Sequence, residues 1–372
     1  FCVYYRRLNA ITVRDTYPLP HMDECIDSLG DSCVFSTLDC NTGYWQIPLR
    51  EADRDKTTFC SHAGTYRFIR MPFGPRNAPA TFQRAIDIIL SGLKRNTCLV
   101  YLGDIIVYST SREANLQHLD EVLSTLENAG LSLKLSKCHF FKKTVDYLGH
   151  VIHPGRLEVA QKNTQALREA KEPRTQTDIK SFLGLCNVYR RFVPRFAAIA
   201  APLTALLRKE TPFALPELTA EQLQAFNVLR ERLLKPPILA LPRAEGRLFL
   251  DTDASAAQLG CCLRQTQPDG STLPLGYWSR TLTSAERNYS TIEKDFLAIV
   301  WAVTHLRPYL ERQQFTVYTD HQALQWVMNL ADAQEQLARW RLRLAEFDFQ
   351  VEYRSGASHH AADATSRLAQ HE

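Results

Sequence analysis

The chain has 372 residues, of which 23% are charged and 45% hydrophobic, and its formal net charge is +4 at pH 7. This composition is ordinary for a globular protein, so it excludes extended disorder and fibrous structure. The length exceeds one typical core, and we therefore expect a multidomain soluble protein of two or three packed units.

Apolar stretches and cysteines exclude further classes of protein. The longest apolar stretch, 296–303, is far shorter than the ~20 residues of a membrane span, so we expect no transmembrane helix and no membrane partner. The ten cysteines are scattered and form no Cys-x-x-Cys pair, which favours reduced intracellular thiols over a disulfide scaffold or a zinc site. The sequence opens at Phe1 without an initiator methionine or a secretory leader, which predicts a piece of a longer protein.

The first part of the sequence alternates short apolar strands with helices. In chain order, the periodicity predicts a strand at 33–39, a helix at 80–93, a hairpin at 100–108, a helix at 117–128 and a strand at 145–152. A Pro154-Gly155 turn follows the last strand, and we place the end of a first unit, 1–155, at this turn.

The remainder divides into a helical region and a second α/β region. Helical patterns between 161 and 240 are interrupted by prolines, among them Pro202, so we expect short packed helices in a unit at 156–243. Strands then resume around a long helix in a unit at 244–372. The fold class that these patterns predict is α+β or α/β, with several domains.

Single aspartates stand where apolar strands of the first unit end. Asp39 closes the strand at 33–39, and Asp104 lies at the tip of the hairpin at 100–108. Strand ends can hold hard divalent cations, which take oxygen ligands, over a groove. Taken alone, an aspartate after an apolar run is more often a cap or a turn residue. The metal-site interpretation therefore depends on the neighbouring residues.

The neighbouring motifs support a metal site. In the first unit they are LNAIT at 8–12, YPLP at 17–20, LD at 38–39 with GY at 43–44, MPFG at 71–74, NAPATFQ at 77–83, YL at 101–102 and LGH at 148–150. Their order and spacing resemble the reverse transcriptases of gypsy-type LTR retrotransposons, the Metaviridae. Further motifs extend the resemblance along the chain: SFLGL at 181–185, YRRF at 189–192 and APL at 201–203.

The resemblance implies a right-hand polymerase followed by a nuclease. Residues 1–155 would form partial reverse transcriptase fingers and a palm, 156–243 a helical thumb and connection, and 244–372 a ribonuclease H-like α/β domain. Asp39 and Asp104 would be catalytic residues and metal ligands of the polymerase.

Further roles in nucleotide and primer binding follow from the same resemblance. Tyr44 stands where the family uses an aromatic ring to exclude a ribose 2′-hydroxyl, and core packing is the alternative for this residue. Phe73 and Gly74 would form the nucleotide-facing turn. The segment that grips the primer end would consist of Leu148, Gly149 and His150.

The hairpin at 100–108 departs from the family at one metal-binding position. Gly103 stands where the family has the first of two adjacent aspartates, and the register keeps Asp104 as the surviving ligand. A glycine at the first central position of a two-residue hairpin satisfies a type II′ turn, so the fold should not suffer. Loss of a residue that supports a metal ligand typically lowers metal affinity or activity ~10–100-fold, and loss of the ligand itself should cost at least as much. We therefore predict weak or absent polymerisation.

Two further departures concern the fingers. Tyr4 stands where the family usually has aspartate, and Phe1 follows the position of an arginine that binds the incoming triphosphate in the family. Both changes add to the expectation that polymerisation is impaired.

A second set of acids lies in the C-terminal region. Asp253 and Asp320 follow apolar strands, and Asp363 lies near the C-terminus. With YWSR at 277–280, ERNY at 286–289, FLAIV at 296–300 and Arg367, these acids resemble the catalytic, metal-binding residues of the ribonuclease H domain that follows the polymerase in such elements. Four acids would hold two ions that activate water against an RNA phosphate.

The fourth nuclease acid is either Glu293 or Asp295, which lie two positions apart on a helix and cannot share a face. The S-x-x-E pattern at 290–293 matches a capping box, in which Glu293 turns back to the helix start. We therefore choose Asp295 as the catalytic metal ligand, in agreement with the register of the family. His321 would either assist near the phosphate or, as we favour, act as a polar cap.

These residues predict an RNA-directed DNA polymerase with ribonuclease H activity, from a retrotransposon polyprotein, that transfers phosphoryl groups with two metal ions. The cofactor would be Mg²⁺, two ions per active centre, with Mn²⁺ as an alternative. The partners would be a primed RNA or DNA template, dNTPs and an RNA–DNA hybrid. Protease and integrase are expected outside this chain, a homodimer stays open, and the resemblance implies a cytoplasmic virus-like particle.

Two other classes remain open. A decayed retroelement copy could bind nucleic acid without polymerising, and a structural partner subunit could support an active chain. Gly103 favours the decayed copy, whereas the retained nuclease acids disfavour a purely structural role.

Overall fold

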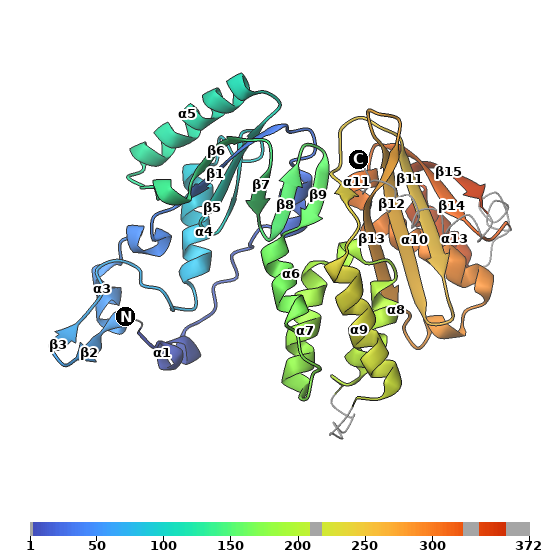
Figure 1. Ribbon diagram of the computed structural model, residues 1–372, viewed down its shortest axis with the longest axis horizontal. Coiled ribbons are helices and arrows are strands. Elements are labelled where there is room, and N and C mark those ends of the chain that lie inside the picture. The colour runs from blue at the N-terminus through green and yellow to red at the C-terminus, as the bar shows by residue number, and fades with distance from the viewer. Residues whose placement is uncertain (1–2, 209–217, 323–334, 355–372) are drawn as a thin grey trace. The chain divides into compact units, whose positions relative to one another are not determined.

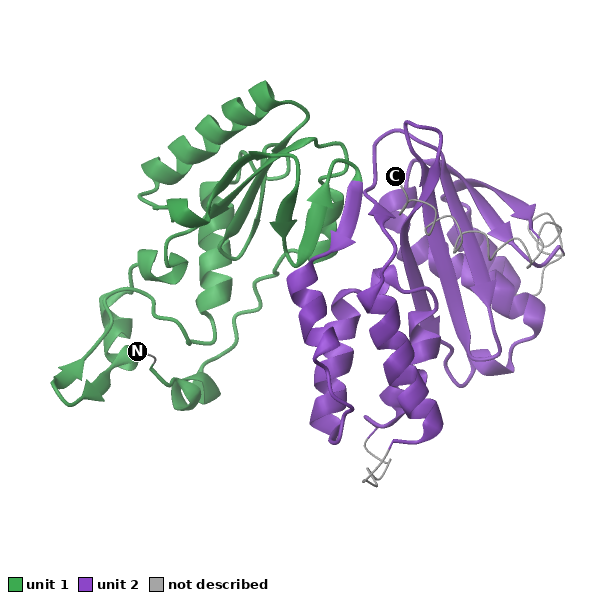
Figure 2. Ribbon diagram, in the orientation of Figure 1, with its two compact units in different colours: residues 1–155 green, residues 156–372 purple. Residues whose placement is uncertain are grey.

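The computed structural model of the protein describes residues 3–208, 218–322 and 335–354 (Figure 1). The chain forms two compact units, 1–155 and 156–372 (Figure 2). The division between them falls at the Pro154-Gly155 turn. The further boundary that we place at 243 stays a prediction.

The first unit is built on a four-stranded antiparallel sheet. Its strands, in spatial order, are β4 (Cys98–Tyr101), β5 (Asp104–Ser109), β1 (Val34–Asp39) and β6 (His139–Lys142). The strand predicted at 33–39 and the hairpin predicted at 100–108 are confirmed.

Two helices share one hydrophobic core with this sheet. They are α4 (Ala78–Ile89) and α5 (Arg112–Asn128), and they bury Phe82 and Val122 completely. Pro79 stands in the first turn of α4, where a missing N–H costs little. Ser111 caps α5 by accepting a hydrogen bond from Ala114 N. The two helices predicted in this unit are thus confirmed, although α5 begins earlier than expected.

The remaining elements of the first unit are short. They are α1 (Arg6–Ile11), α2 (Met22–Asp27), η1 (Gly43–Gln46), α3 (Glu51–Arg54), η2 (Asp55–Thr57), a hairpin of β2 (Phe59–Ser61) and β3 (Gly64–Tyr66), η3 (Leu135–Lys137), and a hairpin of β7 (Val145–Tyr147) and β8 (His150–His153). Asn9 holds the N-terminal segment to the turn before α4, because its Nδ2 donates to Gly74 O at 2.9 Å and its Oδ1 accepts from Arg76 N at 2.7 Å.

The second unit begins with a strand and short helices. They are β9 (Arg156–Val159), α6 (Gln161–Arg168), α7 (Gln176–Val188), η4 (Arg190–Phe192), α8 (Phe196–Ala205) and α9 (Ala220–Leu234). Capping boxes begin α7 at Thr175 and α9 at Thr219. The expectation that Pro202 separates two helices is wrong, since it lies inside α8. Burial of Ala200 and Leu203 holds this helix in the core despite the missing N–H.

A five-stranded mixed sheet forms the rest of the second unit. Its order is β13 (Thr272–Thr281), β12 (Gln258–Thr266), β11 (Leu248–Ala254), β14 (Gln314–Thr319) and β15 (Asp348–Tyr353). The first three strands are antiparallel, whereas β11, β14 and β15 run parallel. Other elements are β10 (Leu239–Ala240), η5 (Glu286–Asn288), α10 (Thr291–His305), α11 (Arg307–Leu310) and α13 (Glu335–Leu344).

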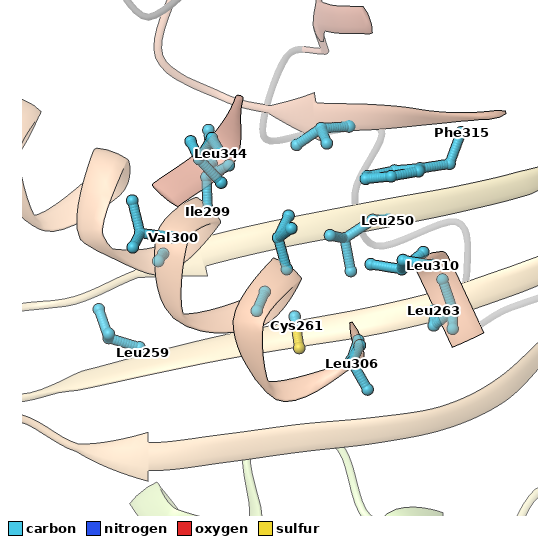
Figure 3. Packing of buried hydrophobic residues seen from close by; sticks show 14 of the residues in the cluster. Leu250, Leu259, Cys261, Leu263, Ile299, Val300, Leu306, Leu310, Phe315 and Leu344 are labelled. Atoms are coloured by element: carbon cyan, nitrogen blue, oxygen red, sulfur yellow. The ribbon is translucent and has the colours of Figure 1, made fainter. Parts of the chain in front are cut away.

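The core of this unit lies between the sheet and its helices. Figure 3 shows Leu250 and Leu263 of the sheet near Leu310 of α11, and Ile299 of α10 beside Leu344 of α13, all in one cluster. β11 alternates buried and half-buried positions, as a strand with one covered face requires. This packing fixes the ends of β11 and β14 relative to α10.

Two candidate carboxylate centres

Asp39 and Asp104 lie opposite each other on neighbouring antiparallel strands. Asp39 ends β1, Asp104 begins β5, and the strand register pairs the two residues. Opposed residues of antiparallel strands have Cα atoms ~4.5–5.5 Å apart. The structure therefore brings together the two acids that the sequence proposes as polymerase ligands, in what we call the first centre.

Lys137 is a cation of the first centre that the sequence analysis missed. Its Nζ lies 3.1 Å from Asp39 Oδ2, although it comes from η3, 98 residues further along the chain. The lysine is exposed and the aspartate is partly exposed, so the pair is worth about 1 kcal/mol or less. Asp39 Oδ2 can therefore leave Lys137 for a partner that binds it more strongly, such as a divalent cation.

The thiol of Cys40 lies in the field of both aspartates. It is buried, and burial followed by the charges of Asp39 and Asp104 raises the pKa of Cys40 to about 12. This shift favours the neutral thiol over the thiolate.

The hairpin turn corrects the sequence analysis at one residue. Tyr101 pairs with Asp104, so the two central residues of the turn are Leu102 and Gly103. The left-handed φ of 57° belongs to Leu102, at the first central position, and Gly103 has no left-handed φ. The expectation that glycine occupies the position that needs a positive φ is therefore wrong.

Gln83 of α4 holds this turn in place, and the sequence analysis did not single it out. Its Oε1 accepts a hydrogen bond from Leu102 N at 2.6 Å, and its Nε2 donates to Val100 O at 3.3 Å. The side chain is fully buried. A buried, satisfied amide of this kind offsets the cost of a left-handed leucine by fixing the turn that contains it.

Position 103 has room for a side chain. A Cβ added to Gly103 would have Phe82 Cε1 as its nearest neighbour, at 3.9 Å, which is an ordinary van der Waals contact. Neither φ nor space therefore requires glycine at position 103, beside Asp39 and Asp104.

Aromatic rings surround Tyr44 next to the first centre. The ring of Tyr44 lies 4.9 Å from that of Phe73 and 5.5 Å from that of Phe82, and burial raises the pKa of its hydroxyl. Gly43 leaves the space that this arrangement needs, since a Cβ there would approach Phe82 Cζ to 2.7 Å. Tyr44 is only half-buried, so both interpretations, ribose exclusion and core packing, fit its position.

The turn at Phe73 and Gly74 has an exposed ring and a constrained backbone. Phe73 is 51% exposed. Gly74 has a φ of 107°, and a Cβ at this position would come within 3.1 Å of Tyr5 Cδ2. This turn therefore requires glycine, in contrast to position 103.

The segment expected to grip the primer is the turn of the β7–β8 hairpin. Leu148 and Gly149 have φ angles of 47° and 82°, as both central residues of a type I′ turn require. His150 is buried, and its Nδ1 lies 3.0 Å from Leu148 O. Leu148 and Gly149 are partly exposed, so a contact with a primer would fall to them more directly than to the imidazole.

Three acids of the second unit face one another in what we call the second centre. Asp251 of β11 pairs with Tyr318 of the parallel strand β14, so Asp253 and Asp320, each two residues further on, lie at the same end of the sheet. Asp295 of α10 is buried, and burial followed by the charges of Asp320 and Asp253 raises its pKa to about 7. The fourth predicted acid, Asp363, lies outside the described residues.

The start of α10 separates the roles of its two acids. Glu293 Oε2 accepts from Ser290 N at 2.7 Å, and Ser290 Oγ accepts from Glu293 N at 3.3 Å, so the predicted capping box is confirmed. Glu293 is thus engaged at the helix start, whereas Asp295 faces Asp253 and Asp320.

Two basic side chains border the second centre. His321 Nδ1 lies 3.4 Å from Asp295 Oδ2, which places the ring beside an acid of the centre and not only at a strand end, where we expected a polar cap. Arg195 Nη2 lies 2.7 Å from Asp253 Oδ2. The sequence analysis missed Arg195, because nothing near position 195 indicates a partner 58 residues away.

The acids of the second centre carry oxygen donors of the kind that divalent cations take. Burial, followed by the charges of Asp320 and Asp253, raises the pKa of Asp295, and a cation beside these acids would reduce their mutual repulsion. In residues 3–208, 218–322 and 335–354, however, no group of three or more histidine, cysteine or acidic side chains is close enough to hold a metal ion. The described acids thus affect one another electrostatically, but their side chains do not lie close enough together to form a set of metal ligands.

Sequence comparison defines the class of the protein. Residues 1–152 match the model for reverse transcriptase (RNA-dependent DNA polymerase), and residues 244–347 match the model for the RNase H-like domain found in reverse transcriptase. Enzymes with these domains generally use divalent metal ions. No helix in the described part of the chain is long and apolar enough to cross a membrane.

Relatives cover nearly the whole chain. The Pol polyproteins from transposons 297 and gypsy of Drosophila melanogaster are 43% and 36% identical to it, and the transposon Tf2-3 polyprotein of Schizosaccharomyces pombe is 33% identical. Each alignment covers 98% of this chain but only 34%, 36% and 28% of the respective relative. The chain belongs to the reverse transcriptase and ribonuclease H family of gypsy-type LTR-retrotransposon Pol polyproteins, and it spans about a third of their length.

Solved structures confirm the predicted fold class. A foamy viral protease-reverse transcriptase in complex with double-stranded DNA has a TM-score of 0.79 at 22% identity, over 94% of this chain and 62% of that one. The same viral enzyme in complex with an RNA/DNA hybrid has a TM-score of 0.71 at 23% identity, over 95% of this chain and 48% of the other. Because the similarity extends over nearly the whole chain, both structures agree with a fold of consecutive α/β units.

Proposed function

We propose that this chain degrades the RNA strand of RNA–DNA hybrids with its second unit and extends primers weakly, or not at all, with its first. The observation that carries the proposal is the contrast at the acids. The second centre gathers Asp253, Asp295 and Asp320, whereas the first has Asp39, Asp104 and an unfilled space at Gly103.

Asp253, Asp295 and Asp320, with Asp363, would hold two Mg²⁺ ions in the second centre. Ions bound there would activate a water and stabilise the leaving oxygen of an RNA phosphate. Burial of Asp295 disfavours its charged form when the centre is empty, so this acid must lose a proton as an ion binds. His321, beside Asp295, is placed to orient that carboxylate.

Asp39 and Asp104 would hold Mg²⁺ or Mn²⁺ in the first centre. Lys137 must give up Asp39 Oδ2 when an ion binds, and their weak exposed pair permits this. Gln83 holds the hairpin that carries Asp104, so the backbone stays ready for catalysis although one carboxylate is missing. Tyr44 and Phe73 form the aromatic surface on which a dNTP would lie.

The substrates would be a primed RNA or DNA template with dNTPs, and an RNA–DNA hybrid. The double-stranded DNA and RNA/DNA hybrid bound to the foamy viral enzymes support this choice. From its resemblance to retrotransposon polyproteins, we place the segment beside protease and integrase in a cytoplasmic virus-like particle, as a monomer or a homodimer.

A second candidate function is nucleic-acid binding by a decayed copy without any polymerisation. Gly103 is the observation that favours it, because the hairpin keeps its shape while one carboxylate is absent. The two candidates differ in hybrid cleavage, which only the enzyme carries out.

Primer extension and hybrid cleavage, measured with Mg²⁺ on one preparation, test the proposal. The unchanged chain should cleave the hybrid and extend poorly, and Gly103→Asp should raise extension at least ~10-fold, since it restores a ligand. Gly103→Asn is the matched control, because it fills the same space without a charge and should leave extension low.

Two outcomes would contradict the proposal. Robust extension by the unchanged chain would show that Gly103 does not impair the first centre. Absence of Mg²⁺-dependent hybrid cleavage would leave nucleic-acid binding without chemistry as the function.

A further inference from the structure

Arg195 lies at the second centre although it comes from the helical part of the unit. Its Nη2 is 2.7 Å from Asp253 Oδ2, and the two side chains are 65% and 47% exposed. Position 195 precedes the region 244–347 that matches the RNase H-like model. A residue outside the matched region thus contacts an acid inside it.

Local preferences do not account for an arginine at this position. Arg195 is the N-cap of α8, with φ 55° and ψ 33°, and its side chain makes no capping hydrogen bond. The left-handed region is costly for residues other than glycine, asparagine and aspartate. A positive charge is also unfavourable at the N-terminus of a helix, where the dipole is positive. The contact with Asp253 therefore explains the residue better than its own helix does.

The backbone around Arg195 is fastened to β13. Arg190 Nη2 donates to Ser279 O at 2.7 Å, and Arg191 Nη2 donates to Leu275 O at 2.9 Å. On the other side, Ala197 N donates to Ser279 Oγ at 2.9 Å. These bonds hold the chain on both sides of position 195, and from there the guanidinium reaches Asp253.

We propose that Arg195 is a positioning residue of the second centre with two successive partners. Before a divalent ion binds, it pairs with Asp253 and reduces the repulsion among Asp253, Asp295 and Asp320. When the ion takes Asp253, the guanidinium is released to a backbone phosphate of the hybrid, which its planar donors fit. This inference rests on the proposed cleavage of hybrids by the second unit.

The exposure of the pair makes this exchange feasible. Exposed ion pairs contribute little, so competition from Arg195 should weaken ion binding by only ~1.5–5-fold. A phosphate contact by one cation contributes a slope of about 0.9 to the dependence of log affinity on log salt concentration. The two roles therefore have separate effects: removing the charge of Arg195 should strengthen ion binding but reduce the salt dependence of hybrid binding.

Arg195→Gln in the full chain tests the proposal, with Asp39→Asn in the background to remove ion binding at the first centre. Mn²⁺ affinity is measured without nucleic acid by electron paramagnetic resonance. Binding of a DNA hybrid with a 2′-O-methyl RNA strand, which resists cleavage, is measured with Mn²⁺ over a series of salt concentrations. Arg195→Gln should bind Mn²⁺ ~1.5–5-fold more tightly and lower the salt slope by about 0.9, while Arg195→Lys keeps most of both properties.

Arg312→Gln is the matched control. Arg312 also has a left-handed φ, of 62°, but it precedes the six residues of β14, whereas Asp320 follows them, so ~20 Å of strand separates the two. Its substitution should leave Mn²⁺ affinity unchanged. Unchanged or weaker Mn²⁺ binding by Arg195→Gln, or an unchanged salt slope, would overturn the inference. Failure of the unchanged chain to cleave a hybrid would instead contradict the proposed function.

Discussion

The two carboxylate centres use different frameworks for similar groups. In the first, Asp39 and Asp104 face each other across one pair of antiparallel strands. In the second, Asp253 and Asp320 end two parallel strands, and Asp295 comes from a helix. Burial of Asp295, followed by the charges of Asp320 and Asp253 from the other two elements, raises its pKa to about 7. The two centres therefore differ in the number of acids that converge, although each lies on a well-formed sheet.

Each centre also keeps one acid paired with a cation. Lys137 lies against Asp39, and Arg195 lies against Asp253. Both cations come from segments distant in the sequence and both pairs are at least partly exposed. Both frameworks therefore hold one acid in a weak ion pair with a basic side chain.

The largest expected effect separates the acids of α10. Asp295→Asn should lower hybrid cleavage at least ~100-fold, because it removes a ligand, and should leave template binding nearly unchanged. Glu293→Gln is the matched control, since glutamine can keep the capping box, as Gln222 does in α9, so stability should change by less than about 0.5 kcal/mol. Cleavage rates at saturating Mg²⁺ and urea unfolding measure the two effects. Loss of cleavage in Glu293→Gln with retention in Asp295→Asn would reverse our assignment.

The next effect concerns the hairpin of the first centre. Gln83→Leu should destabilise the protein by about 1–3 kcal/mol, because it leaves the partly buried N–H of Leu102 without its acceptor. Gln117→Leu on the exposed face of α5 is the control and should change stability by less than about 0.5 kcal/mol. Urea unfolding followed by circular dichroism measures both. Equal stability of the two variants would show that Gln83 does not fix the turn.

The smallest effect concerns pH in the absence of metal. The pKa of Asp295 rises from 3.8 to about 7 on folding, so the folded state binds the proton more tightly than the unfolded state. Stability from this group is therefore present at low pH and is lost as pH rises through 7, by on the order of 1–2 kcal/mol. Unfolding in EDTA at pH 5 and pH 8 should show this loss in the unchanged chain and a smaller one in Asp295→Asn. Parallel pH dependences would contradict it.

Much of the fold and the acids of the site could be predicted from sequence. Alternation of apolar residues located β1 and the hairpin, because side chains of a half-buried strand repeat every second residue. The capping box at Ser290 could be predicted from the sequence, since its contacts span only three residues. Asp39 and Asp104, although distant in sequence, were found because the family motifs fix them.

Contacts set by tertiary packing could not be predicted in this way. Lys137, Gln83 and Arg195 act on partners in other elements, and no local pattern marks such pairs. The turn residue was assigned to Gly103 by intrinsic preference, but the amide of Gln83 places the left-handed conformation at Leu102. Pro202 was read as a helix break for the same reason, because its packing was unknown.

The space beside Gly103 bears on how selection acts on this chain. A Cβ there meets nothing closer than 3.9 Å, so exchanging aspartate for glycine neither strains the hairpin nor leaves a core cavity. Selection removes substitutions that push a protein below the stability needed for function. A change that costs little stability passes that filter and is removed only if polymerisation itself is required. A protein can therefore lose part of its chemistry and still fold well.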